Sequence, residues 1–427
     1  MKTLSITIAI WTAIALLSAG SLVQAENWPE WRGPHENGLS RETGLPTTFS
    51  KTENVAWRVP LPGQGGSTPA IWGDRIFLTS AEGEKNLLLM AYSTSGKLLW
   101  QDVVSDGNRP VRGGEGNYAS PSPSTDGKHV WTMMGTGDLA CYTVDGKNVW
   151  KLNLQERYGK FDIQFGMAST PVLDGDRLYL QLLHSGGPWV VALDKLTGKE
   201  IWKVRRPSDA RAECEQSYAS PILYRDSKQA LLLTHGADYI IAHRLSDGGE
   251  VWRCGGMNPK GSYNTTLRFV ASPAAVEGLI VVPSAKKGPV LGLDPNSKGD
   301  ISDSKEGHHW VHPKNTPDVP SPLIHDGLVY LCGEDGTLTC LSAKTGEVYY
   351  HKPVHRAQHR ASPVYADGKI FLTARDGTIS VVKPGQKLEI LSTNKMDEQM
   401  TSSPAVSNGR IYLRTWDALY AIESPKK

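Results

Sequence analysis

The chain has 427 residues, of which 39% are hydrophobic and 21% charged, and 46 Lys and Arg against 44 Asp and Glu leave a formal net charge of +2. This hydrophobic content excludes an intrinsically disordered chain, and five cysteines are too few for a scaffold built on disulfides. The near-neutral charge argues against a nucleic-acid-binding protein, which needs a concentrated basic surface.

Residues 1–25 have the pattern of a cleavable signal peptide. Lys2 precedes an apolar stretch from Leu4 to Leu17, and the segment ends in the small-residue pattern Val23-Gln24-Ala25. A membrane anchor is the alternative, but the stretch is shorter than the roughly 20 residues that a spanning helix needs. We therefore expect an exported protein, periplasmic or secreted, without a membrane span.

An N-terminal extension, residues 26–53, follows the signal segment and contains the sequence Trp28-Pro29-Glu30-Trp31-Arg32-Gly33-Pro34. Residues 54–57, Asn-Val-Ala-Trp, come next and match Asn148-Val149-Trp150 further along the chain. Because the second copy lies within a repeated unit, the first copy indicates a strand that belongs to the repeat.

A Ser/Thr-Pro step recurs eight times along the chain, and successive prolines are 41 to 52 residues apart. Periods of this length are typical of solenoids, propellers and other repeat arrays. The steps are Thr68-Pro69, Ser120-Pro121, Thr170-Pro171, Ser220-Pro221, Ser272-Pro273, Ser321-Pro322, Ser362-Pro363 and Ser403-Pro404.

Each unit reads as four short strands. A Gly-containing turn suited to a tight hairpin follows the step, and an alternating run such as Arg177-Leu-Tyr-Leu follows the turn. A third strand ends at a small residue, and an aromatic residue stands four positions after the next Gly, as in Gly198 and Trp202. The large ring would cover the small residue and pack one sheet against the next.

These units predict an all-β fold, an eight-bladed β-propeller with four antiparallel strands in each blade, over residues 54–423. The last unit stops after its third strand, and residues 54–60 would supply the missing fourth strand and close the ring. Units 5 and 7 are degenerate, so seven blades remain an alternative. Residues 424–427 form a short tail.

The motif Ala192-Leu-Asp-Lys-Leu-Thr-Gly-Lys-Glu-Ile-Trp202 resembles the repeat of pyrroloquinoline-quinone-like (PQQ-like) propellers. That family includes quinoprotein alcohol dehydrogenases and the propeller lipoprotein of the outer-membrane β-barrel assembly machine. The Trp28–Pro34 sequence is similar to an element that begins many exported members from planctomycete-type bacteria. The resemblance implies a structural role in which Trp28 and Trp31 close one end of the central channel or cap a blade.

The resemblance also describes the cofactor site of the quinone-dependent enzymes, which combines adjacent disulfide-linked cysteines, a Trp, a Ca²⁺ ion and a catalytic Asp. The five cysteines of this chain, Cys141, Cys214, Cys254, Cys332 and Cys340, include no adjacent pair. We therefore expect no cofactor, with PQQ as a disfavoured alternative. Cys141 and Cys340 occupy the small core position, although Cys332–Cys340 and Cys214–Cys254 disulfides remain open alternatives.

Histidines gather in two groups, His308, His309 and His312, and then His351, His355 and His359. Imidazole is a common metal ligand, but no carboxylate or cysteine spacing completes a coordination shell. We expect solvated loops rather than a metal site. No nucleophile elbow is present, so no catalytic residue is predicted.

The connections from each fourth strand to the next first strand are long, and residues that precede the Ser/Thr-Pro steps would surround the mouth of the central channel. Such a mouth suits a small anionic or sugar-like ligand, or a peptide. The alternative is that these side chains hydrate the channel and hold the blades in register. The candidate binding residues are Asn117, Tyr118, Gln164, Gln216, Tyr218, Arg268, His359, Arg360 and Gln399.

The predicted function is a non-catalytic exported scaffold that binds an envelope or secreted protein partner, and no nucleic acid. A quinone- or metal-dependent oxidoreductase with its site in the central funnel is the first alternative. A binder of a small molecule or carbohydrate at the same mouth is the second.

Overall fold

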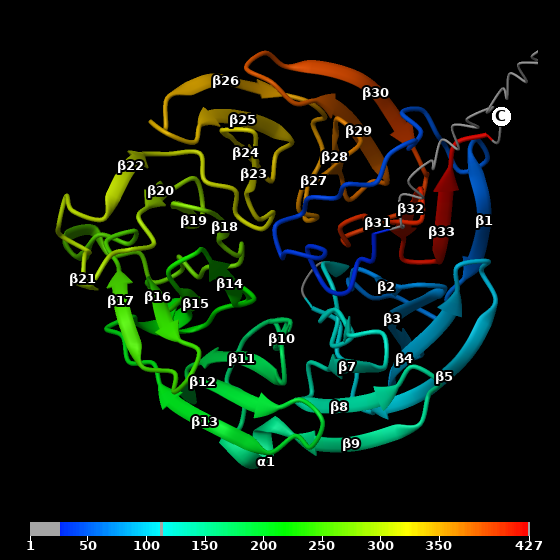
Figure 1. The fold of residues 1–427 in the computed structure, drawn as a ribbon, viewed down its shortest axis with the longest axis horizontal. Helices are drawn as coiled ribbons and strands as arrows, with labels where there is room; N and C mark the ends of the chain where they lie inside the picture. Colours follow the sequence, from blue (N-terminus) through cyan, green and yellow to red (C-terminus); the bar gives the residue numbers. More distant parts are fainter. Residues whose placement is uncertain (1–25, 112–113, 426–427) are drawn as a thin grey trace, which may run out of the picture.

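The computed structural model describes residues 26–111 and 114–425, and the predicted signal peptide lies outside these residues. Strands form eight sheets around one axis, so the predicted eight-bladed β-propeller is confirmed (Figure 1). Within the described residues, no helix has the length and apolar character that crossing a bilayer requires.

Each blade has four antiparallel strands, which follow one another from the axis outward. Blades 1 and 2 are β2 (Ala70–Trp72), β3 (Arg75–Glu82), β4 (Asn86–Ser93), β5 (Leu98–Ser105), and β6 (Ser124–Thr125), β7 (His129–Met133), β8 (Asp138–Thr143), β9 (Asn148–Asn153). Blades 3 and 4 are β10 (Val172–Asp174), β11 (Arg177–His184), β12 (Gly187–Asp194), β13 (Glu200–Arg205), and β14 (Ile222–Arg225), β15 (Ala230–Gly236), β16 (Tyr239–Arg244), β17 (Glu250–Cys254).

The second half of the ring repeats this order. Blades 5 and 6 are β18 (Ala274–Val276), β19 (Leu279–Pro283), β20 (Val290–Leu293), β22 (His308–His312), and β23 (Leu323–His325), β24 (Leu328–Cys332), β25 (Thr337–Ser342), β26 (Val348–Pro353). Blade 7 is β27 (Val364–Ala366), β28 (Lys369–Thr373), β29 (Thr378–Lys383), β30 (Glu389–Lys395), and blade 8 is β31 (Ala405–Ser407), β32 (Arg410–Arg414), β33 (Ala418–Glu423) and β1 (Val55–Pro60). One short helix, α1 (Leu154–Tyr158), follows β9.

The ring closes as predicted, because β1 pairs antiparallel with β33 from Val55↔Ile422 to Pro60↔Ala418. The insertion of unit 5 forms a short strand, β21 (Gly299–Asp300), which pairs in parallel with β17 and covers the outer edge of blade 4. An outer strand otherwise presents unpaired backbone groups, so this insertion protects one blade edge.

The fourth-strand aromatic residues pack one blade against the next, which confirms the prediction from the repeat. Trp202 pairs across the ladder with Ala192, and its Nε1 donates a hydrogen bond to the carbonyl oxygen of Leu245 in blade 4 at 3.0 Å. Gly248 has a φ of 73° and lies under the ring, where a Cβ atom would contact Trp202 at 2.6 Å. Glycine is therefore required both by the backbone conformation and by the close approach.

Five more tryptophans repeat this contact. Each Nε1 donates to a backbone carbonyl of the following blade at 2.8–3.2 Å, and the residues are Trp57, Trp100, Trp150, Trp252 and Trp310. Unit 7 departs from the pattern, since Val381 there faces Ser392. Where a tryptophan is present, the inter-blade contact is thus built from one ring and one hydrogen bond.

Hydroxyl groups link the innermost strands around the axis. The backbone N–H of Thr68 donates to Ser122 Oγ at 3.0 Å, the N–H of Ser122 donates to Thr170 Oγ1, and the pattern continues to Ser403. In blade 2 the ring uses Ser122-Pro123, so the prediction of Ser120-Pro121 for this step is wrong. Seven of the eight steps thus tie one blade to the next.

The N-terminal extension crosses the centre of the ring on one face (Figure 1, dark blue) and contacts the innermost strands of several blades. Trp28 pairs with Ile71 of β2 by two backbone hydrogen bonds, and it is fully buried. Trp31 lines the central channel from this side. The position of Trp31 therefore agrees with closing one end of the channel, whereas Trp28 packs against blade 1, which agrees with the alternative that it caps a blade.

Two carboxylates of the extension accept hydrogen bonds from inner strands. Glu30 accepts from the N–H of Leu173 at 3.4 Å, and Glu36 accepts from the N–H of Leu223 at 2.8 Å. Burial raises the pKa of Glu30, and burial raises the pKa of Glu36 to about 8, with the nearby Asp174 carboxylate adding to the shift.

These pKa shifts predict a pH dependence of stability. A carboxyl group with a raised folded-state pKa favours the folded state when it is protonated, so stability falls as the pH rises from the ordinary value of 4.5 to about 8. We expect the wild-type midpoint of thermal unfolding to drop over this range, and the variant Glu30→Gln, Glu36→Gln to drop less. Calorimetry at several pH values measures both profiles, and parallel profiles would contradict the assignment.

Candidate functional site

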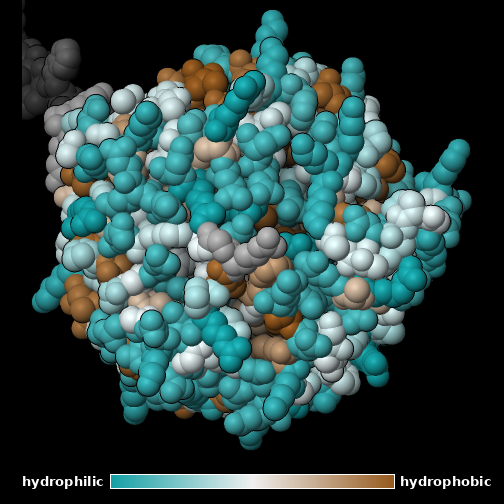
Figure 2. All heavy atoms as spheres, turned by 180° about the vertical axis from the view of Figure 1, so that it is seen from behind, coloured by the Kyte–Doolittle hydropathy of each residue, from teal (hydrophilic) through white to brown (hydrophobic). Residues whose placement is uncertain are grey.

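The face opposite the N-terminal extension carries the mouth of the channel. Figure 2 shows this face, with a hollow near its centre where hydrophobic residues reach the surface. A cavity of about 210 Å³, which we call the mouth cavity, lies in this region. It combines apolar groups with polar ones, and its lining includes Phe165, Met167, Val270, Val319, Asn117, Tyr218, Arg268, Asp318 and Arg360.

The structure places four of the nine predicted site residues, Asn117, Tyr218, Arg268 and Arg360, around the mouth cavity. The other five lie elsewhere in the same connections. Tyr118 packs closely against Gly135 and Gly166, and Gln164 and Gln399 are exposed.

The last two of the nine are buried. Gln216 Oε1 accepts hydrogen bonds from the N–H of Gln164 and from the hydroxyl of Tyr218, at 3.0 and 3.1 Å. His359 is 1% exposed, and burial lowers the pKa of its imidazole. Gln216 therefore supports the mouth through Tyr218, and His359 is held in the neutral form away from solvent.

Arg268 is held in place by aromatic rings and an acid. Its guanidinium lies over the Phe165 ring at 4.9 Å and near the Tyr218 ring at 5.9 Å, and Nη1 pairs with Glu213 at 2.9 Å. The Tyr218 hydroxyl in turn donates a hydrogen bond to Gln216 Oε1 and accepts one from the backbone N–H of Phe165 at 3.2 Å. Such mutual support makes this side of the mouth rigid before any ligand arrives.

Arg360 stands on the other side of the mouth and joins segments that are distant in sequence. Its Nη2 pairs with Glu115 at 2.7 Å and its Nη1 lies 2.9 Å from Glu334, while its side chain is only 10% exposed. Glu115 belongs to the connection between blades 1 and 2, and Glu334 belongs to blade 6. Arg360 therefore fixes the width of the mouth.

A groove continues from the mouth cavity along the seam between blades 5 and 6. Asp318 lines both the mouth cavity and a seam cavity of about 570 Å³. Asp335, Thr337 and His351 line both the seam cavity and an outer cavity of about 560 Å³. We call this continuous depression the seam groove.

The two walls of the seam groove carry opposite charges. Lys286 and Lys287 form one wall, in the turn between β19 and β20, and both have left-handed backbone conformations with φ of 48° and 67°. Glu334 and Asp335 form the other wall, in the turn between β24 and β25. Non-glycine residues with positive φ are uncommon and are often found at functional sites. None of these four residues was among the site residues predicted from the sequence.

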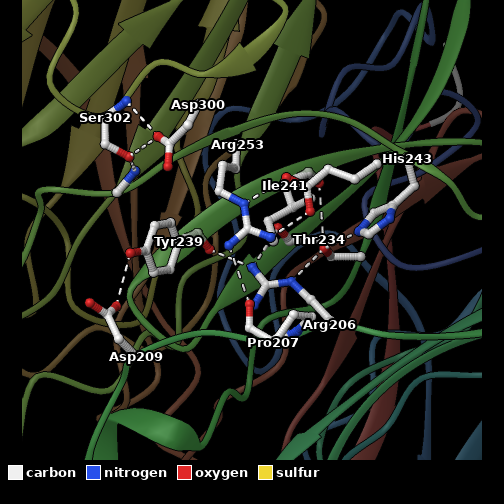
Figure 3. A network of polar contacts seen from close by, with 12 residues as sticks. Arg206, Pro207, Asp209, Thr234, Tyr239, Ile241, His243, Arg253, Asp300 and Ser302 are labelled. Atoms are coloured by element: carbon white, nitrogen blue, oxygen red, sulfur yellow. Dashed lines mark hydrogen bonds and ion pairs between the residues drawn. The ribbon is translucent and has the colours of Figure 1, made fainter.

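A buried polar network lies in blade 4, beside the outer loops (Figure 3). Arg206 is 1% exposed and donates to Thr234 Oγ1 at 2.8 Å and to the carbonyl oxygen of Tyr239 at 2.7 Å. Thr234 also contacts His243 Nε2 at 3.0 Å, and burial lowers the pKa of His243 to about 4. His243 is therefore neutral at physiological pH, and the network holds the loops after β13 and β15 in place.

The cysteines and histidines of the described part of the chain make individual polar contacts, among them Cys254 Sγ with His308 Nε2 at 3.4 Å. All five cysteines are free and buried, so neither of the two disulfides left open forms. Among residues 26–111 and 114–425 there is no group of three His, Cys, Asp or Glu side chains suited to a metal ion. His355 instead pairs with Asp376 at 2.8 Å, and His309 Nε2 contacts the carbonyl oxygen of Gly278 at 2.9 Å.

Comparison with known proteins agrees with the β-propeller fold described above. A family model described as outer membrane protein assembly factor BamB matches residues 89–294 and 286–388. A search of curated proteins found no match.

Several solved structures share the fold. BamB from Moraxella catarrhalis is 16% identical, with a TM-score of 0.61 over 86% of this chain and 99% of that one. Quinohemoprotein alcohol dehydrogenase from Comamonas testosteroni is 12% identical, with a TM-score of 0.67 over 94% and 81%. A europium-containing methanol dehydrogenase is 13% identical, with a TM-score of 0.68 over 92% and 90%. At these identities the likeness concerns the fold alone.

Proposed function

The chain belongs to the family of outer membrane protein assembly factor BamB, whose model matches most of its blades, and on that basis we propose that it is a non-catalytic scaffold of the cell envelope. It would be exported by its N-terminal signal segment and bind an extended segment of a partner protein. The partner segment would enter the mouth cavity and continue along the seam groove.

The observation that carries this proposal is the continuity of the depression. The mouth cavity alone, at about 210 Å³, is smaller than the roughly 300–1,000 Å³ of typical small-molecule sites. Together with the seam groove it forms a track from the axis to the outer strand β26. A rigid track with one basic and one acidic wall suits a polypeptide, whose side chains would meet both charges.

The residues at the mouth do not fit the quinone of the related dehydrogenases. The aromatic rings of the mouth belong to Phe165 and Tyr218 rather than to a tryptophan, and the cysteines are buried away from it. Burial also raises the pKa of the thiols of Cys141 and Cys254 to about 12, so they remain protonated. These features support a binding role over oxidation of a substrate.

Site-specific photo-crosslinking in the native host tests the proposal. We would place a photoreactive amino acid at Val319 in the mouth, at Thr337 in the seam groove, and at Ile201 on the outer strand of blade 3 as a control. We expect Val319 and Thr337 to yield an adduct with one and the same envelope protein, and Ile201 to yield little of it. Equal yields at all three positions, or none at Val319 and Thr337, would contradict the proposal.

A charge variant sharpens the test, because Lys287 lines the seam groove opposite Asp335 and forms no ion pair within 4.0 Å among the described residues. Lys287→Glu is expected to lower the Thr337 adduct roughly fivefold, the effect of one exposed charge pair. Titration with PQQ and Ca²⁺ tests the oxidoreductase alternative separately. The absorbance spectrum of the quinone should not change, and a saturable change would favour the enzyme.

A further inference from the structure

A cavity of about 140 Å³ lies on the propeller axis, between Trp31 of the N-terminal extension and the mouth cavity, and we call it the axial chamber. Its wall includes the Ser or Thr residue of one Ser/Thr-Pro step from each blade. These residues are Thr68, Ser122, Thr170, Ser220, Ser272, Ser321, Ser362 and Ser403. The chamber shares no lining residue with the seam groove, but it shares Tyr218, Val319 and Arg360 with the mouth cavity.

The hydroxyls of this ring have unused hydrogen-bond donors. Seven of the eight oxygens accept a backbone N–H of the preceding blade. A hydroxyl also has one hydrogen to donate. Within the parts of the chain that the structure describes, none of the eight hydroxyls donates to a protein acceptor. Eight O–H donors therefore surround the axis and require an acceptor from outside the protein.

Further unpaired donors face the same space. Thr401 and Arg360 both line the chamber, and Thr401 Oγ1 and Arg360 Nε are buried without a hydrogen-bond partner among the described residues. The Arg360 side chain is only 10% exposed. An unsatisfied buried donor costs about 1–3 kcal/mol, so a ligand that accepts from these groups would be favoured.

A buried cation lies next to the chamber. Arg32 is 2% exposed, and its guanidinium donates to the carbonyl oxygens of Pro322 and Pro363 at 2.6 and 3.3 Å. These prolines directly follow Ser321 and Ser362 of the hydroxyl ring. Arg32 forms no ion pair with any described carboxylate, and its pKa is lowered to about 9 by burial, so it is charged at neutral pH. A buried charge without a counter-ion is costly.

We propose that the axial chamber binds a small inorganic anion of halide size. The hydroxyl ring, Thr401 and Arg360 Nε supply the hydrogen-bond donors, and Arg32 supplies positive potential from the side of the N-terminal extension. Water molecules occupy the remaining volume, since each needs about 30 Å³.

Bromide binding to the full mature protein in solution tests this assignment. The linewidth of the ⁸¹Br resonance reports exchange of bromide with a protein site, and chloride should compete for it. The test variant is Thr401→Val, which removes a donor from the chamber without changing the side-chain shape. Its matched control is Thr132→Val, which removes an equally unpartnered buried hydroxyl from β7, outside the chamber.

We expect excess broadening for the wild type, the same for Thr132→Val, and roughly fivefold weaker bromide binding for Thr401→Val, as for the loss of one hydrogen bond. Arg360→Gln should weaken binding further, and thermal unfolding establishes that each variant is folded. Crystals grown in bromide should show an anomalous peak on the axis within the hydroxyl ring. Absence of excess broadening in the wild type would show that the chamber holds water only. Equal binding by both threonine variants would place the bromide site outside the chamber, and either result would overturn the proposal.

Discussion

A chain that begins at Leu61 is expected to lose the cooperative unfolding of the intact propeller. Such a chain lacks β1, so β33 loses its antiparallel partner and becomes an open edge. It also lacks Trp57, whose Nε1 bonds to Thr94 of blade 1 at 2.9 Å and whose ring lies 6.0 Å from that of Tyr412. Both sides of the closing blade are therefore weakened at once, and unpaired edges promote association.

A second truncation separates closure from the N-terminal extension. A chain that begins at Asn54 keeps β1 and loses only the extension, so it should retain one cooperative transition at a lower midpoint. Calorimetry and size-exclusion chromatography compare the two chains. If the chain that begins at Leu61 is monomeric and melts like the one that begins at Asn54, the closing strand does not have the role assigned to it.

Trp202→Ala is expected to destabilise the protein by about 3–5 kcal/mol, the usual cost of removing a buried aromatic side chain from a core. The side chain is 9% exposed, covers Ala192 within its own blade and bonds to Leu245 in the next. Gly248, which lies against the ring, has no side chain that could move in to fill the space. The cavity left by the Trp202→Ala substitution therefore stays open, and the free energy of unfolding falls by its full cost.

The control for this variant is Trp72→Ala, which removes a tryptophan from β2 that is 38% exposed. We expect a clearly smaller loss, because part of that ring already contacts solvent. Urea denaturation with both variants measures the difference. Equal losses of stability in the two variants would mean that the fourth-strand tryptophan has no special role in joining the blades.

The fold could be predicted because its signals are local and repeated. The small residue on the third strand and the aromatic on the fourth are directly paired, as in Ala192↔Trp202, and only about ten residues separate them in the chain. The closing strand was recognisable for the same reason, because residues 54–57 match part of a unit. The degenerate unit 5 still forms a blade because Trp310 keeps its pairing with Gly292 beyond the insertion, and unit 7 forms one because its strands pair with Ser392 in place of a Trp.

The candidate site was less predictable, because it depends on how long connections turn after leaving the blades. The rule that residues before a Ser/Thr-Pro step surround the mouth correctly predicted Arg268 and Arg360. It was wrong for His359, the direct neighbour of Arg360, because His359 turns into the interior. The seam groove arises between turns about 50 residues apart, and its only local signal is two consecutive lysines in a hairpin turn. The buried Glu30 and the half-buried Glu36 also look like ordinary solvated residues in the sequence.

The pairing between β1 and β33 has a mechanical consequence. Val55, the first residue of β1, faces Ile422 near the end of β33, so the two chain ends leave the closing blade from the same edge. Tension applied between residues 54 and 424 would load one residue pair of β1 and β33 at a time, in the manner of a zipper, rather than all pairs in shear. Tension applied at the N-terminus would first load the contacts of the N-terminal extension, such as the pairing of Trp28 with Ile71.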